Sequence, residues 1–293
     1  MNNDVLNMNR LGRYLVTDIR NAVARFGISL LVIATISLTG YLLTGCMSLF
    51  TGNGWHSMGV IGRFFLFGIS TVIILVASPA RIYGFITDKK EGSSYLTVPV
   101  SGFEKTVSMV LVSCIIVPLA FFAIYLLLDQ IVCLLDHSCG DSILMILGER
   151  RVNLANALSD EFKDMDFYFP KALTALSNPF LYMDDIAEVC LIFLLGALIF
   201  KSSKPAKTIG CLILISIAFS MIATPIFTYG VLDADKFREL TASGNITPDE
   251  LFDMFPVMSW MMKHPVLVDT ISDTLVNVGL FIAIYFRVKR IKH

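Results

Sequence analysis

The stretch from Gly27 to Phe50 contains 24 consecutive residues without one charged side chain. A helix that crosses a hydrocarbon layer of about 30 Å needs about 20 mostly apolar residues, because each residue advances it by about 1.5 Å. The composition agrees, since 55% of the 293 residues are hydrophobic and 16% are charged, against about 25% charged in a typical soluble domain. The chain is therefore predicted to be an integral membrane protein.

The hydropathy pattern predicts an all-α integral membrane protein with six transmembrane helices. The expected spans cover residues 27–50, 63–80, 106–128, 179–200, 208–230 and 265–286. Arg63, in the first turn of the second span, is expected to extend its long stem to the interface. Pro118 is expected to kink the third span, because proline removes a backbone hydrogen bond. The six spans form one domain over residues 27–287, between a helix over 1–26 and a basic tail over 288–293.

Lysine and arginine are distributed unequally between alternate connections. Fifteen of the 23 lie on the side of both termini, and eight are spread over the longer connections of the other side. Because cytoplasmic loops retain cations, we expect both termini in the cytoplasm.

The N-terminal segment has the pattern of an amphipathic helix. Apolar residues recur at spacings of three and four: Met8, Leu11, Leu15, Ile19, Ala22, Val23 and Phe26. Arg10, Arg13, Arg20 and Asn21 occupy the opposite face. Such a helix is expected to lie along the inner membrane surface and contact lipid, whereas a simple cytosolic extension of the first span would not require the apolar stripe.

The two long outer connections, 131–178 and 231–264, are expected to contain short helices. In the second, Thr247 and Glu250 form a capping box with Pro248 at the first helical position. In the first, Cys133 and Cys139 face the outside together, with an aspartate and a histidine between them. A disulfide, two unpaired thiols and a metal site are all compatible with this spacing, and of the three we do not expect the metal.

Motifs for nucleotide, dinucleotide and zinc-protease chemistry are missing from the sequence. We therefore expect no catalytic residue, no cofactor and no enzymatic activity in this chain. The formal net charge of −1 leaves no general basic surface, so nucleic acid is not an expected partner.

Acidic residues cluster at the outer ends of two spans. Asp269, Asp273 and Asn277 recur every four residues on the last span, while Asp184 and Glu188 lie on the fourth. A carboxylate inside a membrane commonly marks a substrate or ion pathway. Near an interface the same residues are also explained as hydrated helix ends, because acids favour helix N-termini.

The connection between the second and third spans, residues 84–105, carries the most specific pattern of the sequence. A charged group containing Asp88 precedes Glu91 and Gly92, Leu96 and Pro99 follow, and Ser101 with Glu104 forms a capping box before Lys105. This pattern resembles the cytoplasmic loop of type-2 ABC exporter permeases, particularly bacterial members. In that family the loop includes a coupling helix that docks into a separate ATPase subunit.

The resemblance implies the role of several residues and partners. Asp88, Glu91, Gly92, Leu96, Pro99 and Lys105 would couple the chain to an ATPase that hydrolyses ATP elsewhere. The glycine-to-proline distance is one residue shorter than in common members, and Ser94 stands where an acid is frequent. The resemblance further implies a second permease chain, identical or related, and a location in the bacterial inner membrane.

Two other functions fit the same sequence. An ion-coupled secondary carrier would use Asp269 and Asp273 to move protons. A non-transporting membrane sensor or assembly subunit would share the topology, and no residue separates it from an exporter.

Overall fold

The structure is a computed structural model that describes residues 7–52, 54–87, 92, 95, 98–140, 142–145, 179–225 and 265–291. Within these residues it consists of helices and short connections, without a strand. The longer helices are α1 (Met8–Ala34), α2 (Ile36–Phe50), α3 (Val60–Tyr83), α5 (Gly102–Val110), α6 (Val117–Leu135), α10 (Pro179–Ile199), α11 (Lys204–Pro225) and α15 (Pro265–Arg290). The short ones are η1 (Gly84–Thr87), η2 (Leu111–Ile116), η3 (His137–Cys139) and α7 (Ile143–Met145).

Five helical stretches in the described part of the chain are long and apolar enough to cross a membrane. They are Met8–Phe50, Gly62–Thr87, Gly102–Leu135, Lys204–Ile222 and Thr270–Arg290. The prediction of an all-α membrane protein is thereby confirmed. The 21-residue helix α10 covers most of the fourth expected span, and the count of six stays a prediction.

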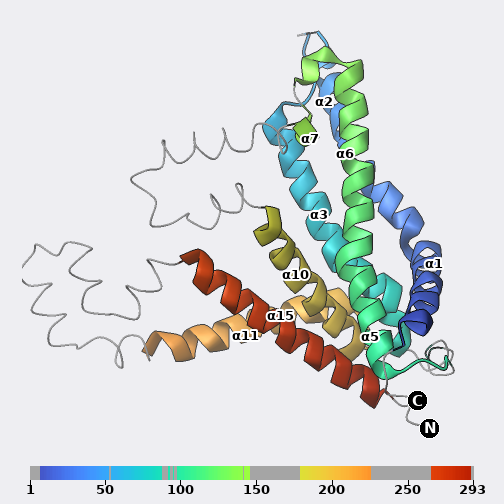
Figure 1. Ribbon diagram of the computed structural model, residues 1–293. Helices are drawn as coiled ribbons and strands as arrows, with labels where there is room; N and C mark the ends of the chain where they lie inside the picture. The colour runs from blue at the N-terminus through green and yellow to red at the C-terminus, as the bar shows by residue number, and fades with distance from the viewer. Residues whose placement is uncertain are drawn as a thin grey trace, which may run out of the picture.

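Helices α1 and α2 follow one another at the N-terminal end of the chain and meet at Thr35. The backbone N–H of Thr35 donates to the carbonyls of Leu31 and Ile33, so the chain continues from one helix into the next. Helix α1 runs through residues 26 and 27, where the surface helix was expected to give way to the first span. The two helices follow one another along one side of the molecule (Figure 1).

The buried face of α1 packs on protein. Its buried residues recur every four positions, at Asp18, Ala22, Phe26, Leu30 and Ala34, and the helix contacts α3, α5 and α6. Two residues of the expected apolar stripe, Met8 and Val23, are instead exposed. The buried stripe therefore includes Ala22 and Phe26 of the expected one, and it adds Asp18, which the sequence prediction did not contain.

Helices α5, η2 and α6 follow one another without a break. Residues Leu111–Ile116 form a π-helical turn immediately before Pro118. Such a turn accommodates a residue that lacks a backbone N–H. The backbone thus departs from a regular α-helix just before this proline, and the kink itself stays a prediction. The carbonyl of Ser113 accepts a hydrogen bond from the Cys190 thiol at 3.4 Å, which joins this turn to α10.

Helix α10 lies at the centre of the helix packing, in contact with α3, α11 and α15. Gly196 is required where α11 folds back, because a Cβ at this position would collide with the side chain of Thr208. By contrast, residues 211–222 of α11 are exposed. An apolar helix surface of this size requires lipid or another chain to cover it.

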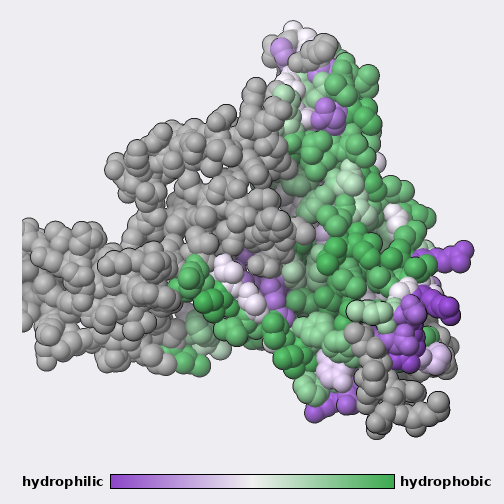
Figure 2. All heavy atoms as spheres, viewed as in Figure 1, coloured by the Kyte–Doolittle hydropathy of each residue, from purple (hydrophilic) through white to green (hydrophobic). Residues whose placement is uncertain are grey.

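The connections gather at two ends of the molecule (Figure 1). The N-terminal part of α1, the start of α5, the α10–α11 connection and the end of α15 lie at one end. The α2–α3 connection and the end of α6 lie at the other. Figure 2 shows apolar side chains covering α6, with hydrophilic ones gathered toward the end where α1 begins.

The outer connections are described only in part. The single-turn helices η3 and α7 lie at the start of the first one. Residues 146–178 and 226–264, including the capping box at Thr247, lie outside the described residues. The short helices expected there stay a prediction.

Candidate functional site

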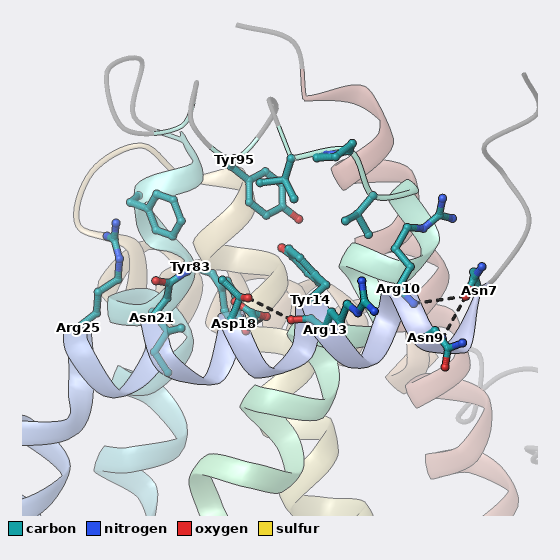
Figure 3. A pocket seen from close by; sticks show the side chains of 16 residues that line it. Asn7, Asn9, Arg10, Arg13, Tyr14, Asp18, Asn21, Arg25, Tyr83 and Tyr95 are labelled. Atoms are coloured by element: carbon teal, nitrogen blue, oxygen red, sulfur yellow. Dashed lines mark hydrogen bonds between the residues drawn. The ribbon is translucent and has the colours of Figure 1, made fainter.

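A cavity of about 750 Å³ lies between the N-terminal half of α1 and the segment that leads into α5; we call it the α1–loop cavity (Figure 3). Its α1 wall is formed by polar side chains from consecutive helical turns, Asn7, Asn9, Arg10, Arg13, Tyr14, Thr17, Asp18, Asn21 and Arg25. Its other wall is formed by Ile82, Tyr83, Phe85, Tyr95, Val98, Pro99 and Val100. Of the polar face expected on α1, Arg20 alone does not line this cavity.

The start of α5 is bound to the start of α1 through Glu104. The predicted capping box is confirmed, since the Glu104 N–H donates to Ser101 Oγ at 3.2 Å and the Ser101 N–H donates to Glu104 Oε2 at 3.0 Å. The same carboxylate accepts from Arg10 Nε and Nη2, each at 2.8 Å, and from the Asn7 N–H at 2.9 Å. Glu104 is fully buried. A buried carboxylate is tolerated when its oxygens are paired in this way.

Asp18 joins three helices. Its Oδ2 atom accepts hydrogen bonds from the Tyr83 hydroxyl of α3 at 2.8 Å and from Ser108 Oγ of α5 at 2.7 Å. The carboxyl group is buried where α1 crosses both helices. This network was missed from the sequence, although an aspartate four residues before Ala22, in line with the buried stripe, was a detectable signal.

Lys105 and Tyr95 anchor the end of the loop. The buried Lys105 Nζ donates to the Tyr95 carbonyl at 2.8 Å and lies 4.6 Å from the centre of its ring. Burial raises the pKa of Tyr95 well above its usual value, and neighbouring Tyr14 and Asp18 add to this shift. In Figure 3 the hydroxyl ends of Tyr14 and Tyr95 point toward one another across the cavity. The loop is therefore tied to α1 as well as to α5.

The start of the loop is also bound. Lys204 Nζ of α11 donates to the Gly84 carbonyl, and Thr87 Oγ1 donates to the same carbonyl at 2.9 Å. The Arg25 guanidinium lies 3.8 Å from the centre of the Phe85 ring, a cation–π contact. Both ends of the 84–105 connection are thus held by side chains from other helices.

The predicted coupling residues fall into two groups. Asp88, Glu91 and Leu96 lie outside the described residues. Of the others, Gly92 is buried and helical, Pro99 is exposed and lines the α1–loop cavity, and Lys105 is the buried anchor described above.

The predicted pathway residues lie on α10 and α15, which pack against one another. The side chains of Asp184 and Asp269 lie outside the described residues. Glu188 and Asp273 are half-buried, and each interacts with another group of the protein. Asn277 is half-buried too, and its Oδ1 atom is buried without a hydrogen-bond partner in the structure.

At the other end of the molecule, Arg63 is turned inward. Its Nη1 atom lies 3.0 Å from Asp129 Oδ1 and 2.7 Å from Cys133 Sγ, and its Nη2 atom donates to the Cys139 carbonyl at 2.9 Å. The expectation that Arg63 reaches the interface was wrong, because a buried carboxylate is within its range. Asp129 was missed since it lies one residue beyond the expected end of the third span. Its Oδ2 atom also accepts from the Ile143 N–H at 2.7 Å.

The Cys133 and Cys139 thiols are not bonded to one another in the structure. The disulfide, one of the alternatives left open by the sequence, stays a prediction. Across the described ranges, no group of three or more histidine, cysteine or acidic side chains is placed to hold a metal ion.

Comparisons with protein-family models, with curated proteins and with solved structures find no match to this chain.

Proposed function

We propose that this chain is the transmembrane permease subunit of an ATP-driven exporter of the type-2 ABC class. In this proposal it spans the bacterial inner membrane six times, with both termini in the cytoplasm. A separate ATPase subunit binds the connection 84–105, and a second permease chain completes the transporter. The sequence pattern from Asp88 to Lys105 and the membrane-length helices support it.

The observation that carries the proposal is the attachment of this connection at both ends. Lys105 holds the Tyr95 carbonyl, and Lys204 holds the Gly84 carbonyl. The Glu104 and Asp18 networks then join the start of α5 to α1 and α3. A displacement of the loop would therefore be transmitted to these three helices, as a rigid-body movement driven by nucleotide requires.

A connection that only joined two spans would not require buried charged groups at its end. Removing an ionised group from water costs several kcal/mol unless other groups pair with it. Glu104 and Lys105 are both buried at the end of the connection, and both are paired. These contacts fix the two ends of the connection more closely than a linker requires.

Lipid and a second permease chain are the proposed partners of the exposed apolar helices. Residues 211–222 of α11 expose apolar side chains. A surface of this kind is compatible with either partner.

Co-purification with an ATPase tests the proposal. The tagged chain would be expressed with the Walker-motif ATPase encoded nearest to it, and residues 88–99 would be replaced by a Gly/Ser segment of equal length. We expect the wild type to retain the ATPase, and the variant to insert in the membrane but lose it. The control is the same exchange at residues 201–203, an exposed connection at the same end of the molecule.

Two results would overturn the proposal: retention of the ATPase by the 88–99 variant, or no ATPase bound to the wild type. Transport by the purified chain under an ion gradient, without nucleotide, would favour the secondary-carrier alternative instead.

A further inference from the structure

The α1–loop cavity presents an unusual density of hydrogen-bond donors. Arg10, Arg13 and Arg25 line it, together with the side-chain amides of Asn7, Asn9 and Asn21. Among the lining residues that the structure describes, Asp18 is the one carboxylate, and its Oδ2 atom already accepts from two hydroxyl groups. The wall is therefore locally basic in a chain whose formal net charge is −1.

The three arginines differ in what they already bind. Arg10 is engaged by Glu104, and Arg25 lies over the Phe85 ring. Arg13 is exposed, and in Figure 3 its side chain extends from α1 toward the cavity. Guanidinium groups bind phosphate through paired, charge-assisted hydrogen bonds. Arg13 is thus the residue best placed to bind an anion.

The cavity has the size of a ligand site. Its volume of about 750 Å³ falls within the range of about 300–1,000 Å³ that is common for small-molecule sites. Amide and hydroxyl groups beside the arginines, from Asn21, Thr17 and Tyr14, suit the oxygens of a phosphate ester and of an attached polyol.

The position of Arg13 on the helix indicates where the phosphate comes from. At 100° per residue, Arg13 lies between Thr17 on the cavity face and Val16 on the adjoining face. Val16 and Val23 share that adjoining face and are 68% and 63% exposed. A basic edge between a polar face and exposed apolar residues is the arrangement by which interfacial helices contact anionic lipid.

We propose that the α1–loop cavity binds a phosphate group, supplied by the headgroup of an anionic phospholipid whose acyl chains lie along Val16 and Val23. The site is built from α1 and the segment before α5. It does not depend on the proposed ATPase.

Native mass spectrometry of the purified full chain in neutral detergent tests this site. The chain would be titrated with phosphatidylglycerol, with phosphatidylcholine of the same chain length and with inorganic phosphate. We expect phosphatidylglycerol to bind most tightly and Arg13→Gln to weaken it about tenfold, the loss expected for one charge-assisted contact. Arg13→Lys should weaken it less, because it retains the charge without the planar fork.

Arg81→Gln is the matched control, since it removes an exposed arginine of α3 that does not line the cavity. Asn21→Asp is a second variant, which places a negative charge on the cavity wall and should weaken phosphatidylglycerol binding without removing an arginine. Equal affinity of wild type and Arg13→Gln for phosphatidylglycerol would overturn the site. An equal loss in Arg81→Gln would also overturn it, because binding would then reflect general charge. Binding of inorganic phosphate as tight as that of the lipid, and lost in Arg13→Gln, would overturn the lipid source.

Discussion

Replacing Glu104 with glutamine tests the joint between α1 and α5. The substitution keeps the shape of the side chain but removes its charge. The two 2.8 Å contacts from Arg10 go to different oxygens of the carboxylate. Because glutamine keeps only one oxygen, one contact becomes a hydrogen bond to a neutral acceptor and loses about 1 kcal/mol, whereas the other faces an amide NH₂ group and is lost. The new amide must also face the N–H of Ser101 or of Asn7, both of which now donate to the carboxylate.

A buried donor left without an acceptor costs about 1–3 kcal/mol. Water recovers part of the total, because the Arg10 side chain is 32% exposed. We therefore expect local opening of this joint to become easier by about 2–3 kcal/mol, which corresponds to about 30- to 150-fold faster amide exchange.

Hydrogen exchange measured by mass spectrometry on the solubilised chain reports this opening directly. The peptides that contain residues 7–12 and 98–105 should exchange faster in Glu104→Gln, while peptides from α6 should not change. Arg20→Gln, an exposed substitution on α1, is the control. A change of less than about twofold at residues 98–105 would show that Glu104 does not hold α5 to α1.

Three further predictions concern other parts of the structure. Asp129→Leu alone should destabilise the chain by about 3–5 kcal/mol in thermal unfolding, because Arg63 would stay buried without its carboxylate partner. Replacing both Asp129 and Arg63 with leucine should restore most of this loss of stability. Hydrogen bonds from Tyr41, Ser138 and Trp55 lower the pKa of Asp136, so its contribution to stability is complete above about pH 4 and is lost as the pH falls further. In a Trp260→Phe variant, which leaves Trp55 as the one tryptophan, fluorescence should show this acid transition, and Asp136→Asn should remove it. Gly196→Ala should destabilise the chain by about 1–3 kcal/mol through overpacking and so lower the melting temperature, whereas Gly210→Ala, where a Cβ meets open space, should not. Equal effects would contradict the proposed packing.

The elements predictable from the sequence are those specified by local pattern. Long apolar runs predict helices because few charged residues interrupt them, and the structure has helices at Gly62–Thr87 and Gly102–Leu135. The capping box at Ser101 was predictable because both partners lie within four residues. Pro118 likewise indicates irregularity in its own helix.

The missed features depend on pairs that are distant in the sequence. Asp18 is 65 positions from Tyr83 and 90 from Ser108, so nothing near it indicates that a buried aspartate will be satisfied. Arg63 was assigned to the interface for the same reason, since Asp129 lies 66 positions away. The burial of Asp18 on α1 depends on such pairs, because its hydroxyl partners lie on α3 and α5.

Photo-crosslinking from the loop tests the central proposal most directly. A photoreactive amino acid in place of Leu96 would be activated in living bacterial cells, and the captured proteins would be identified by mass spectrometry. The proposal predicts that a cytoplasmic protein with a nucleotide-binding P-loop is captured, and that the same probe in place of Trp55, at the opposite end of the molecule, does not capture it. Capture of periplasmic proteins from position 96, or of the same ATPase from both positions, would contradict it.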